Sequence, residues 1–144
     1  MGRRFGLDAG AINEGLARAK GPDHRMARVE VGGVTVIDDA YNANPESMAA
    51  ALDAFAEVSR GSARRVVVLG DMLELGDQTA ASHLEIVFRV GSWKSRPCPW
   101  SQVVLVGPLM GAAAEQLGRT GQLDAPVARY PELTGEVVRE IAGM

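Results

Sequence analysis

Hydrophobic and polar residues alternate over residues 27 to 38, and this period of two predicts a β-hairpin. Valine occupies every second position of the two arms, at Val29, Val31, Val34 and Val36. Between the arms lies Gly32-Gly33. The tight primed turns that join hairpin strands use positive φ, which glycine adopts without strain. The pattern therefore predicts two antiparallel strands joined at this dipeptide.

After the hairpin, segments of helical periodicity alternate with short, continuously apolar runs. Helices are predicted over residues 45–60, 78–90, 109–117 and 131–142, with one more over 8–19 ahead of the hairpin. Strands are predicted over 65–69, 103–106 and 127–130. The runs from Arg65 to Leu69 and from Val103 to Val106 are typical of parallel strands covered on both faces. The order from the hairpin onward is β-α-β-α-β-α-β-α, which predicts an α/β fold with a mostly parallel sheet and helices on both faces.

The composition is that of an ordinary globular domain and excludes several classes of function. The 144 residues are 47% hydrophobic and 23% charged, with a net charge of -3 at pH 7. This balance argues against a nucleic-acid-binding or polybasic membrane surface. The single cysteine, Cys98, cannot form an internal disulfide, which fits a reducing, cytoplasmic compartment. No apolar run reaches the roughly 18 residues of a membrane span, and the charged first residues lead into no apolar segment of a signal peptide.

Two clusters of polar residues follow predicted strands. The first contains Asp38, Asp39, Tyr41, Asn42, Asn44 and Ser47, and the second contains Gly70, Asp71 and Glu74. In an open α/β sheet, ligands bind at the carboxyl ends of the strands. Carboxylates there can hold a ribose hydroxyl, a magnesium ion or a substrate ammonium group, and asparagine amides can pair with a carboxylate or an amine. Both clusters are therefore candidate binding sites.

These residues also have a purely structural interpretation. Asn44 precedes Pro45, and the pair has the features of a helix N-cap and a first helical residue. Asp38 and Asp39 can be solvated turn residues, and Asp71 can be an ordinary turn or capping acid. Spacing alone leaves these alternatives open.

The histidines and the cysteine show no metal-binding or nucleophilic pattern. His24 and His83 are the only histidines, and neither has a second histidine or a cysteine at metal-ligand spacing. A lone histidine is more often a surface or packed residue than a ligand. Cys98 lies among prolines with no obvious base. We predict no metal site and no catalytic residue within this chain, whose sequence also contains no G-x-x-x-x-G-K-[ST] loop.

Two strings resemble motifs of the Mur ligase family. Residues 36–48 read VIDDAYNANPESM and residues 68–76 read VLGDMLELG. Both have the form typical of the MurF branch, whose members add D-alanyl-D-alanine to the peptidoglycan precursor. Residues 24–26 and 104–108 give weaker matches, and the resemblance covers most of residues 7–118. It implies that residues 25–144 form a Rossmann-like C-terminal domain, and that residues 1–24 are the last helix and linker of a central ATP-binding domain.

The resemblance also implies a reaction and a role for each motif residue. In this family ATP phosphorylates the carboxylate of UDP-MurNAc-tripeptide, and the amino group of D-Ala-D-Ala then attacks the acyl phosphate. The ATP phosphates would be reached by Arg25, and the ATP ribose would be held by Asp39. The substrate-binding residues near the dipeptide and the acyl phosphate would be Asn42, Asn44, Ser47, Asp71 and Glu74. ATP and Mg²⁺ would bind mainly to the central domain of the same polypeptide, so residues 25–144 alone would be inactive.

Three features depart from the family pattern. The P-loop lysine and the magnesium ligands are missing, residues 84–101 match poorly, and the chain ends at Met144 where the family continues into a further strand. We therefore expect a C-terminal domain that is truncated at its end, with a role in peptidoglycan biosynthesis, cell shape and cell division. The alternatives are a stand-alone, non-catalytic binding module of the same fold, or a domain of another Mur or folylpolyglutamate-type ligase.

Overall fold

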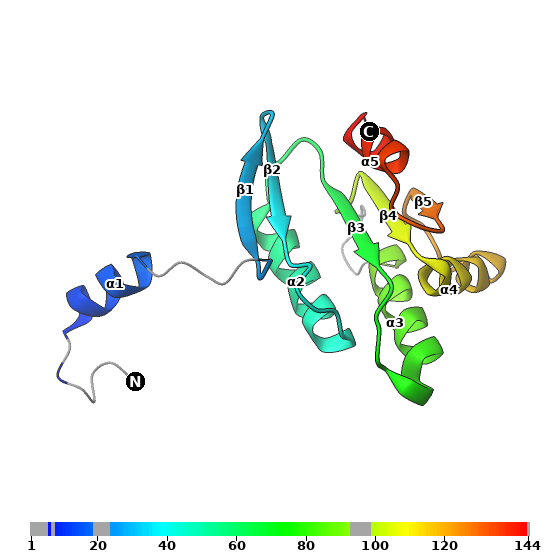
Figure 1. Ribbon diagram of the computed structural model, residues 1–144, viewed down its shortest axis with the longest axis horizontal. Coiled ribbons are helices and arrows are strands. Elements are labelled where there is room, and N and C mark those ends of the chain that lie inside the picture. Colours follow the sequence, from blue (N-terminus) through cyan, green and yellow to red (C-terminus); the bar gives the residue numbers. More distant parts are fainter. Residues whose placement is uncertain (1–5, 7, 19–23, 93–98, 144) are drawn as a thin grey trace. The chain divides into compact units, whose positions relative to one another are not determined.

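The computed structural model describes residues 6, 8–18, 24–92 and 99–143. The chain folds as two compact units, Met1–Tyr41 and Asn42–Met144 (Figure 1). Two predicted features, the linker that ends the first helix and most of the irregular loop at 91–101 with Cys98, lie outside the described residues. The predicted domain boundary after residue 24 stays a prediction.

The first unit contains a helix and the hairpin. Helix α1 spans Ala9–Arg18, and strands β1 (Ala27–Val31) and β2 (Val34–Asp38) pair in antiparallel register. Gly32 and Gly33 join them with φ of 57° and 82°, which confirms the predicted turn. The four hairpin valines remain between 42% and 61% exposed. A two-stranded hairpin without buried side chains has little stability of its own.

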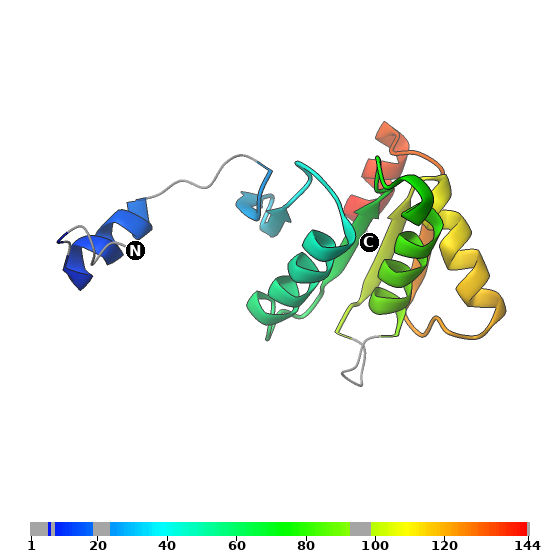
Figure 2. The same cartoon turned by 90° about the horizontal axis from the view of Figure 1, so that it is seen from below.

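The second unit is the predicted α/β domain (Figures 1 and 2). Its elements are α2 (Pro45–Val58), β3 (Val66–Gly70), the 3₁₀ turn η2 (Gly76–Gln78), α3 (Thr79–Gly91), β4 (Gln102–Val106), α4 (Pro108–Arg119), β5 (Val127–Tyr130) and α5 (Gly135–Gly143). The strands form one parallel sheet in the order β3-β4-β5, and helices flank it. The predicted fold class is therefore confirmed.

The predicted order of elements is confirmed, with one boundary shifted. Its first strand is β2, which hydrogen-bonds to the antiparallel β1 in the hairpin, and the parallel sheet of the described residues contains the other three strands. The last helix begins at Gly135 rather than at Pro131, because the Thr134 hydroxyl oxygen caps it by accepting the Val137 N–H at 3.2 Å.

Burial on both faces was expected for β3 and β4, and it is found in β4 but not in β3. Val103, Val104 and Leu105 of β4 are fully buried, so both faces of this strand are covered. In β3, Val67 and Leu69 are buried while Val68 is 48% exposed. The difference arises because β4 lies between two strands of the sheet and β3 has β4 as its one partner there.

The helices complete the core around β4. Helix α2 buries Met48 and Leu52, and its Phe55 stacks on the buried Trp100 with ring centroids 5.5 Å apart. Helix α3 contributes fully buried Ile86, Val87 and Val90 and packs against both α2 and α4. None of the helices in the described part of the chain has the length and apolarity that crossing a membrane requires.

The parallel register brings the carboxyl ends of the strands to one edge of the sheet. Gly70 lies opposite Val106, which in turn lies opposite Tyr130. The loops that follow these residues therefore leave the sheet at the same edge, where α/β proteins bind ligands.

Candidate functional site

In the first unit, the carboxylates at the end of β2 tie down the segment that precedes the hairpin. One oxygen of Asp38 contacts His24 Nδ1 at 2.6 Å and the other accepts the Ala40 N–H at 3.0 Å. The hydrogen bond from His24, followed by that from Ala40, holds the pKa of Asp38 below its ordinary value of 3.8. Asp39 accepts the Met26 N–H at 2.9 Å. Both acids therefore stabilise local structure, as a turn interpretation of them requires.

The segment that these acids hold is strained. His24 and Met26 have φ of 57° and 50°, in the left-handed region that side chains disfavour. Each such residue costs on the order of 1 kcal/mol. The bonds from Asp38 and Asp39, together with the Tyr41 N–H that donates to the His24 carbonyl at 3.0 Å, offset this cost. The result is a fixed backbone on either side of Arg25.

Arg25 is presented to solvent from this strained turn. Its guanidinium carbon lies 4.2 Å from the centroid of the Tyr41 ring, a cation–π contact, and both side chains are exposed. Asp39 binds the amide of Met26, directly after Arg25, so the two residues predicted to bind ATP belong to the same turn. A cation can bind a phosphate, and a carboxylate can bind a hydroxyl.

Among the predicted substrate-binding residues, Asn44 and Ser47 form the start of helix α2. The Asn44 side-chain oxygen accepts the Ser47 N–H at 2.9 Å, and the Ser47 hydroxyl oxygen accepts the Asn44 N–H at 3.2 Å. This capping box, with Pro45 as the first helical residue, confirms the predicted N-cap. The Asn42 side-chain oxygen accepts the Ala43 N–H at 2.9 Å. Contacts of these three residues with a substrate stay a prediction.

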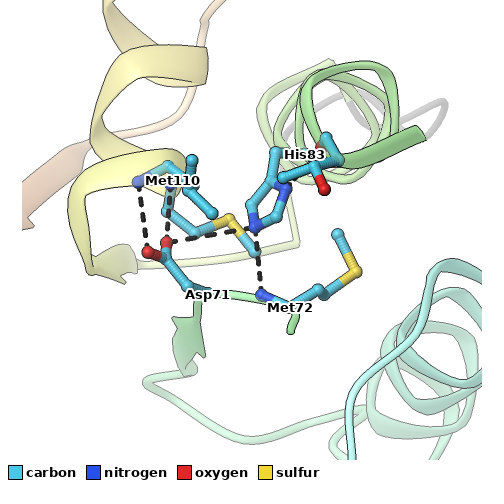
Figure 3. A network of polar contacts seen from close by, with 6 residues as sticks. Asp71, Met72, His83 and Met110 are labelled. Atoms are coloured by element: carbon cyan, nitrogen blue, oxygen red, sulfur yellow. Dashed lines mark hydrogen bonds and ion pairs between the residues drawn. The ribbon is translucent and has the colours of Figure 1, made fainter. Parts of the chain in front are cut away.

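Asp71 caps a helix far from it in the sequence. Its two carboxylate oxygens accept the N–H groups of Leu109 and Met110 at 3.1 and 2.8 Å (Figure 3). These donors belong to the first turn of α4, whose own N-cap residue, Gly107, has no side chain to offer. A carboxylate at a helix N-terminus satisfies otherwise unpaired donors and is attracted by the helix dipole.

Gly107 allows Asp71 to approach this closely. Its φ is 111°, and a Cβ atom at this position would collide with the Asp71 carboxylate. The capping interpretation of Asp71 is therefore confirmed, and a contact with substrate remains a prediction for the lone pairs that face away from α4.

Glu74 lies at the exposed part of the loop between β3 and α3. Its φ is 61°, although it is not a glycine, and its side chain is exposed. Leu73 beside it is 74% exposed, whereas Met72 is 1% exposed and packs in the core. The loop thus presents a carboxylate and an apolar side chain to solvent from a backbone conformation that costs free energy.

His83 anchors this loop, and sequence reasoning did not find that role. Its side chain is 1% exposed, with Nε2 accepting the Met72 N–H at 3.0 Å and Nδ1 donating to the Thr79 carbonyl at 2.6 Å (Figure 3). The partners assign the neutral ring with its proton on Nδ1. The sequence supports the packed interpretation of a lone histidine, but nothing local to it identifies the amide to which it binds.

An open groove of about 360 Å³ lies on the same edge of the sheet. It is lined by Gly107, Pro108, Gly111, Glu115, Arg129, Tyr130 and Pro131. None of the predicted site residues contributes to it. The described residues contain no group of three His, Cys, Asp or Glu side chains that could hold a metal ion.

Fold and loops define the second unit as an α/β domain of the kind that binds ligands at its strand ends. Residues 24–134 match the model of the family described as Mur ligase, glutamate ligase domain, and the chain belongs to this family. The UDP-N-acetylmuramoyl-tripeptide–D-alanyl-D-alanine ligase of Treponema pallidum is 43% identical over 86 residues, which cover 60% of this chain and 18% of that ligase. The corresponding ligase of Mycobacterium leprae is 44% identical over 95 residues, which cover 54% of this chain and 18% of that ligase.

A ligase of another specificity and solved structures match over more of the chain. The UDP-N-acetylmuramoylalanine–D-glutamate ligase of Rubrobacter xylanophilus is 33% identical over 153 residues, covering 92% of this chain and 32% of that ligase. A crystal structure of MurF from Acinetobacter baumannii has a TM-score of 0.72 at 26% identity, covering 96% of this chain and 27% of that one. MurF from Thermotoga maritima in complex with ADP matches in fold, with a TM-score of 0.69 at 21% identity. This match covers 98% of this chain and 29% of that one. The chain thus spans a third or less of the length of each of these relatives.

Proposed function

We propose that this chain is the C-terminal domain of an ATP-dependent ligase that joins D-Ala-D-Ala to UDP-MurNAc-tripeptide in peptidoglycan precursor synthesis. The observation that carries the proposal is the specificity of its relatives. Seven curated D-alanyl-D-alanine ligases are 38–52% identical to the matched segments, against 33% for the D-glutamate ligase. The reaction would take place in the cytoplasm, where the nucleotide-linked precursor is available.

The geometry around Arg25 supports a contact with the nucleotide. The guanidinium is exposed and oriented by the Tyr41 ring, and the neighbouring Asp39 carboxylate is fixed by the Met26 N–H. In the proposed reaction Arg25 binds the ATP phosphates and Asp39 the ribose hydroxyls. Charge on a transferring phosphoryl group is stabilised by positioned cations and requires little covalent help. The P-loop and Mg²⁺ ligands would come from the central domain.

The charge of the proposed amine-binding residues favours a dipeptide over a dicarboxylic amino acid. Asn42, Asn44 and Ser47 are neutral, Asp71 and Glu74 are acidic, and none of the five is a cation. The ammonium group of D-Ala-D-Ala can donate hydrogen bonds to these side chains. The second carboxylate of D-glutamate would be repelled by the two acidic side chains. Glu74 matters most in this argument, because its carboxylate is exposed while both oxygens of Asp71 bind α4.

The test is a hybrid ligase in which this chain replaces the matching region of Acinetobacter baumannii MurF. Phosphate release is measured with UDP-MurNAc-tripeptide and ATP, with D-Ala-D-Ala or D-glutamate as the amine. We expect kcat/KM for D-Ala-D-Ala to exceed that for D-glutamate by at least about 100-fold, since a site built for one charge pattern discriminates strongly against another. Equal rates, or a preference for D-glutamate, would contradict the proposal.

An inactive hybrid calls for a second measurement on the 144-residue chain itself. Amide chemical shifts are followed by NMR during titration with D-Ala-D-Ala, with L-Ala-L-Ala as the matched control. Selective shifts at residues 42–47 and 71–75 would support the amine-binding assignment. The stand-alone binding module would be favoured if the native cells produce a protein of 144 residues and this protein binds D-Ala-D-Ala selectively. Identical responses to the two dipeptides would count against an amine site in this domain.

A further inference from the structure

We propose that His83 is a positioning residue of the amine-binding site, acting by fixing the loop that carries Glu74. The inference rests on the proposed function for the identity of the amine. The β3–α3 loop is defined here as residues 71–78. Two of its exposed residues, Leu73 and Glu74, follow directly after the amide that His83 binds.

The position of His83 is set by two hydrogen bonds on opposite sides of its ring. Nδ1 donates to the Thr79 carbonyl one turn earlier in α3, and Nε2 accepts the Met72 N–H from the loop. The side chain is 1% exposed, so water cannot replace either partner without opening the core. The ring therefore connects a rigid helix to the first part of the loop.

The neutral ring also leaves Asp71 bound to α4. Nε2 lies 4.0 Å from an Asp71 carboxylate oxygen (Figure 3). This contact is not an ion pair, because the Met72 N–H occupies the lone pair of Nε2. A protonated or displaced ring would compete with Leu109 and Met110 for the Asp71 carboxylate. His83 thus holds Met72 while leaving the Asp71 cap undisturbed.

The far end of the loop is fixed by hydrogen bonds that do not involve the His83 ring. The Thr79 hydroxyl donates to the Gly76 carbonyl at 2.7 Å, and the Gln78 N–H donates to the Leu75 carbonyl at 3.1 Å. With both ends anchored, the unfavourable φ of Glu74 can persist, because surrounding contacts determine it. Releasing Met72 removes one anchor and lets Glu74 relax away from the geometry in which it meets the substrate.

Two substitutions separate the two ring nitrogens. His83→Asn places an amide near the position of Nδ1, where it can still donate to Thr79 but is too short to reach Met72. His83→Gln extends to the position of Nε2, where its oxygen can accept the Met72 N–H. Val87→Ala is the matched control, because it removes buried volume one turn further along the same helix and takes away no hydrogen bond to the loop.

The first measurement is amide hydrogen exchange in the full 144-residue chain. We expect His83→Asn to raise exchange at Met72 by about 10-fold or more, the factor for one lost buried hydrogen bond. His83→Gln should stay near the wild type, and the amides of β4 should not respond to either. Equal exchange at Met72 in the wild type and His83→Asn would overturn the proposal.

The second measurement is made on the hybrid ligase. We expect His83→Asn to raise KM for D-Ala-D-Ala by about 10-fold with KM for ATP unchanged, and His83→Gln to restore it. Val87→Ala should lower Tm and leave both KM values in place. An equal rise of KM in Val87→Ala would make His83 an ordinary stability residue. If the wild-type hybrid rejects D-Ala-D-Ala, the proposed function fails, while the exchange measurement still decides whether His83 fixes the loop.

Discussion

At position 74 the backbone and the side chain have conflicting requirements. A φ of 61° favours glycine or asparagine, yet the residue is glutamate and its side chain is exposed. Strain of this kind is retained where the surrounding structure enforces it, and it gathers at functional sites. The observation supports the role in amine binding that the family motif implies for Glu74.

Two substitutions test this conflict directly. Glu74→Gly should raise the free energy of unfolding by up to about 1 kcal/mol, because glycine has no Cβ to clash at positive φ. Glu74→Gln should leave that free energy unchanged. Both should raise KM for D-Ala-D-Ala in the hybrid ligase, since both remove the carboxylate. Urea unfolding and steady-state kinetics measure the two effects, and normal kinetics in both variants would reduce Glu74 to a turn residue.

The sequence predicts single residues well only where their partners are local. Asn44 was predicted as an N-cap because the signal, an asparagine followed directly by proline, is local. The partners of Asp71 lie 38 and 39 residues away, and those of His83 are backbone groups. No local sequence pattern predicts either contact. The capping of α4 and the anchoring of the loop could therefore be recognised only from the structure.

At the scale of elements, helix α4 depends on a residue that does not belong to it. Gly107 and Pro108 start the helix but supply no side-chain acceptor. The carboxylate of Asp71, which directly follows β3, accepts the free N–H groups of the first turn instead. The contact also joins β3 to α4 across the carboxyl edge of the sheet. Asp71 therefore contributes to the stability of the second unit whether or not it meets a substrate.

We predict that Asp71→Ala lowers the free energy of unfolding by about 1 to 3 kcal/mol, for two lost bonds to a charged, partly buried acceptor. Asn44→Ala is the comparison, with an expected loss of about 1 kcal/mol for an exposed cap. Urea unfolding of the full chain, followed by far-UV circular dichroism, measures both. An Asp71→Ala variant as stable as the wild type but impaired with D-Ala-D-Ala would make ligand binding its principal role.

Helices and strands could be predicted from the sequence because each has its own hydrophobic period. Which strands pair in the sheet could not be predicted in this way. Apolar runs identified β3, β4 and β5 alike, yet they could not tell the central strand from an edge strand. That distinction depends on which strands pair, and it decides why Val104 is buried while Val68 is half exposed.

At the scale of the whole molecule, the proposed ligand contacts are divided between units of unequal internal packing. Arg25 and Asp39 belong to Met1–Tyr41, in which no described residue is buried. The proposed amine-binding residues belong to Asn42–Met144, which contains the described core. Ligand-binding elements commonly come from the less stable parts of a protein, where binding can order them.

This division predicts a large difference in hydrogen exchange along the chain. Amides of β1 and β2 should exchange at least about 100-fold faster than those of β4, because local opening of the hairpin exposes little apolar surface whereas opening β4 requires the core to unfold. Exchange of the full chain, resolved by NMR, provides the measurement, and the amides of α3 are the internal control for a packed element.

Addition of ADP should slow exchange at Met26 and Ala40 selectively if Arg25 and Asp39 bind the nucleotide, because a ligand stabilises the folded form to which it binds. Hairpin amides as protected as those of β4 without nucleotide would show that the four exposed valines find an apolar partner in solution.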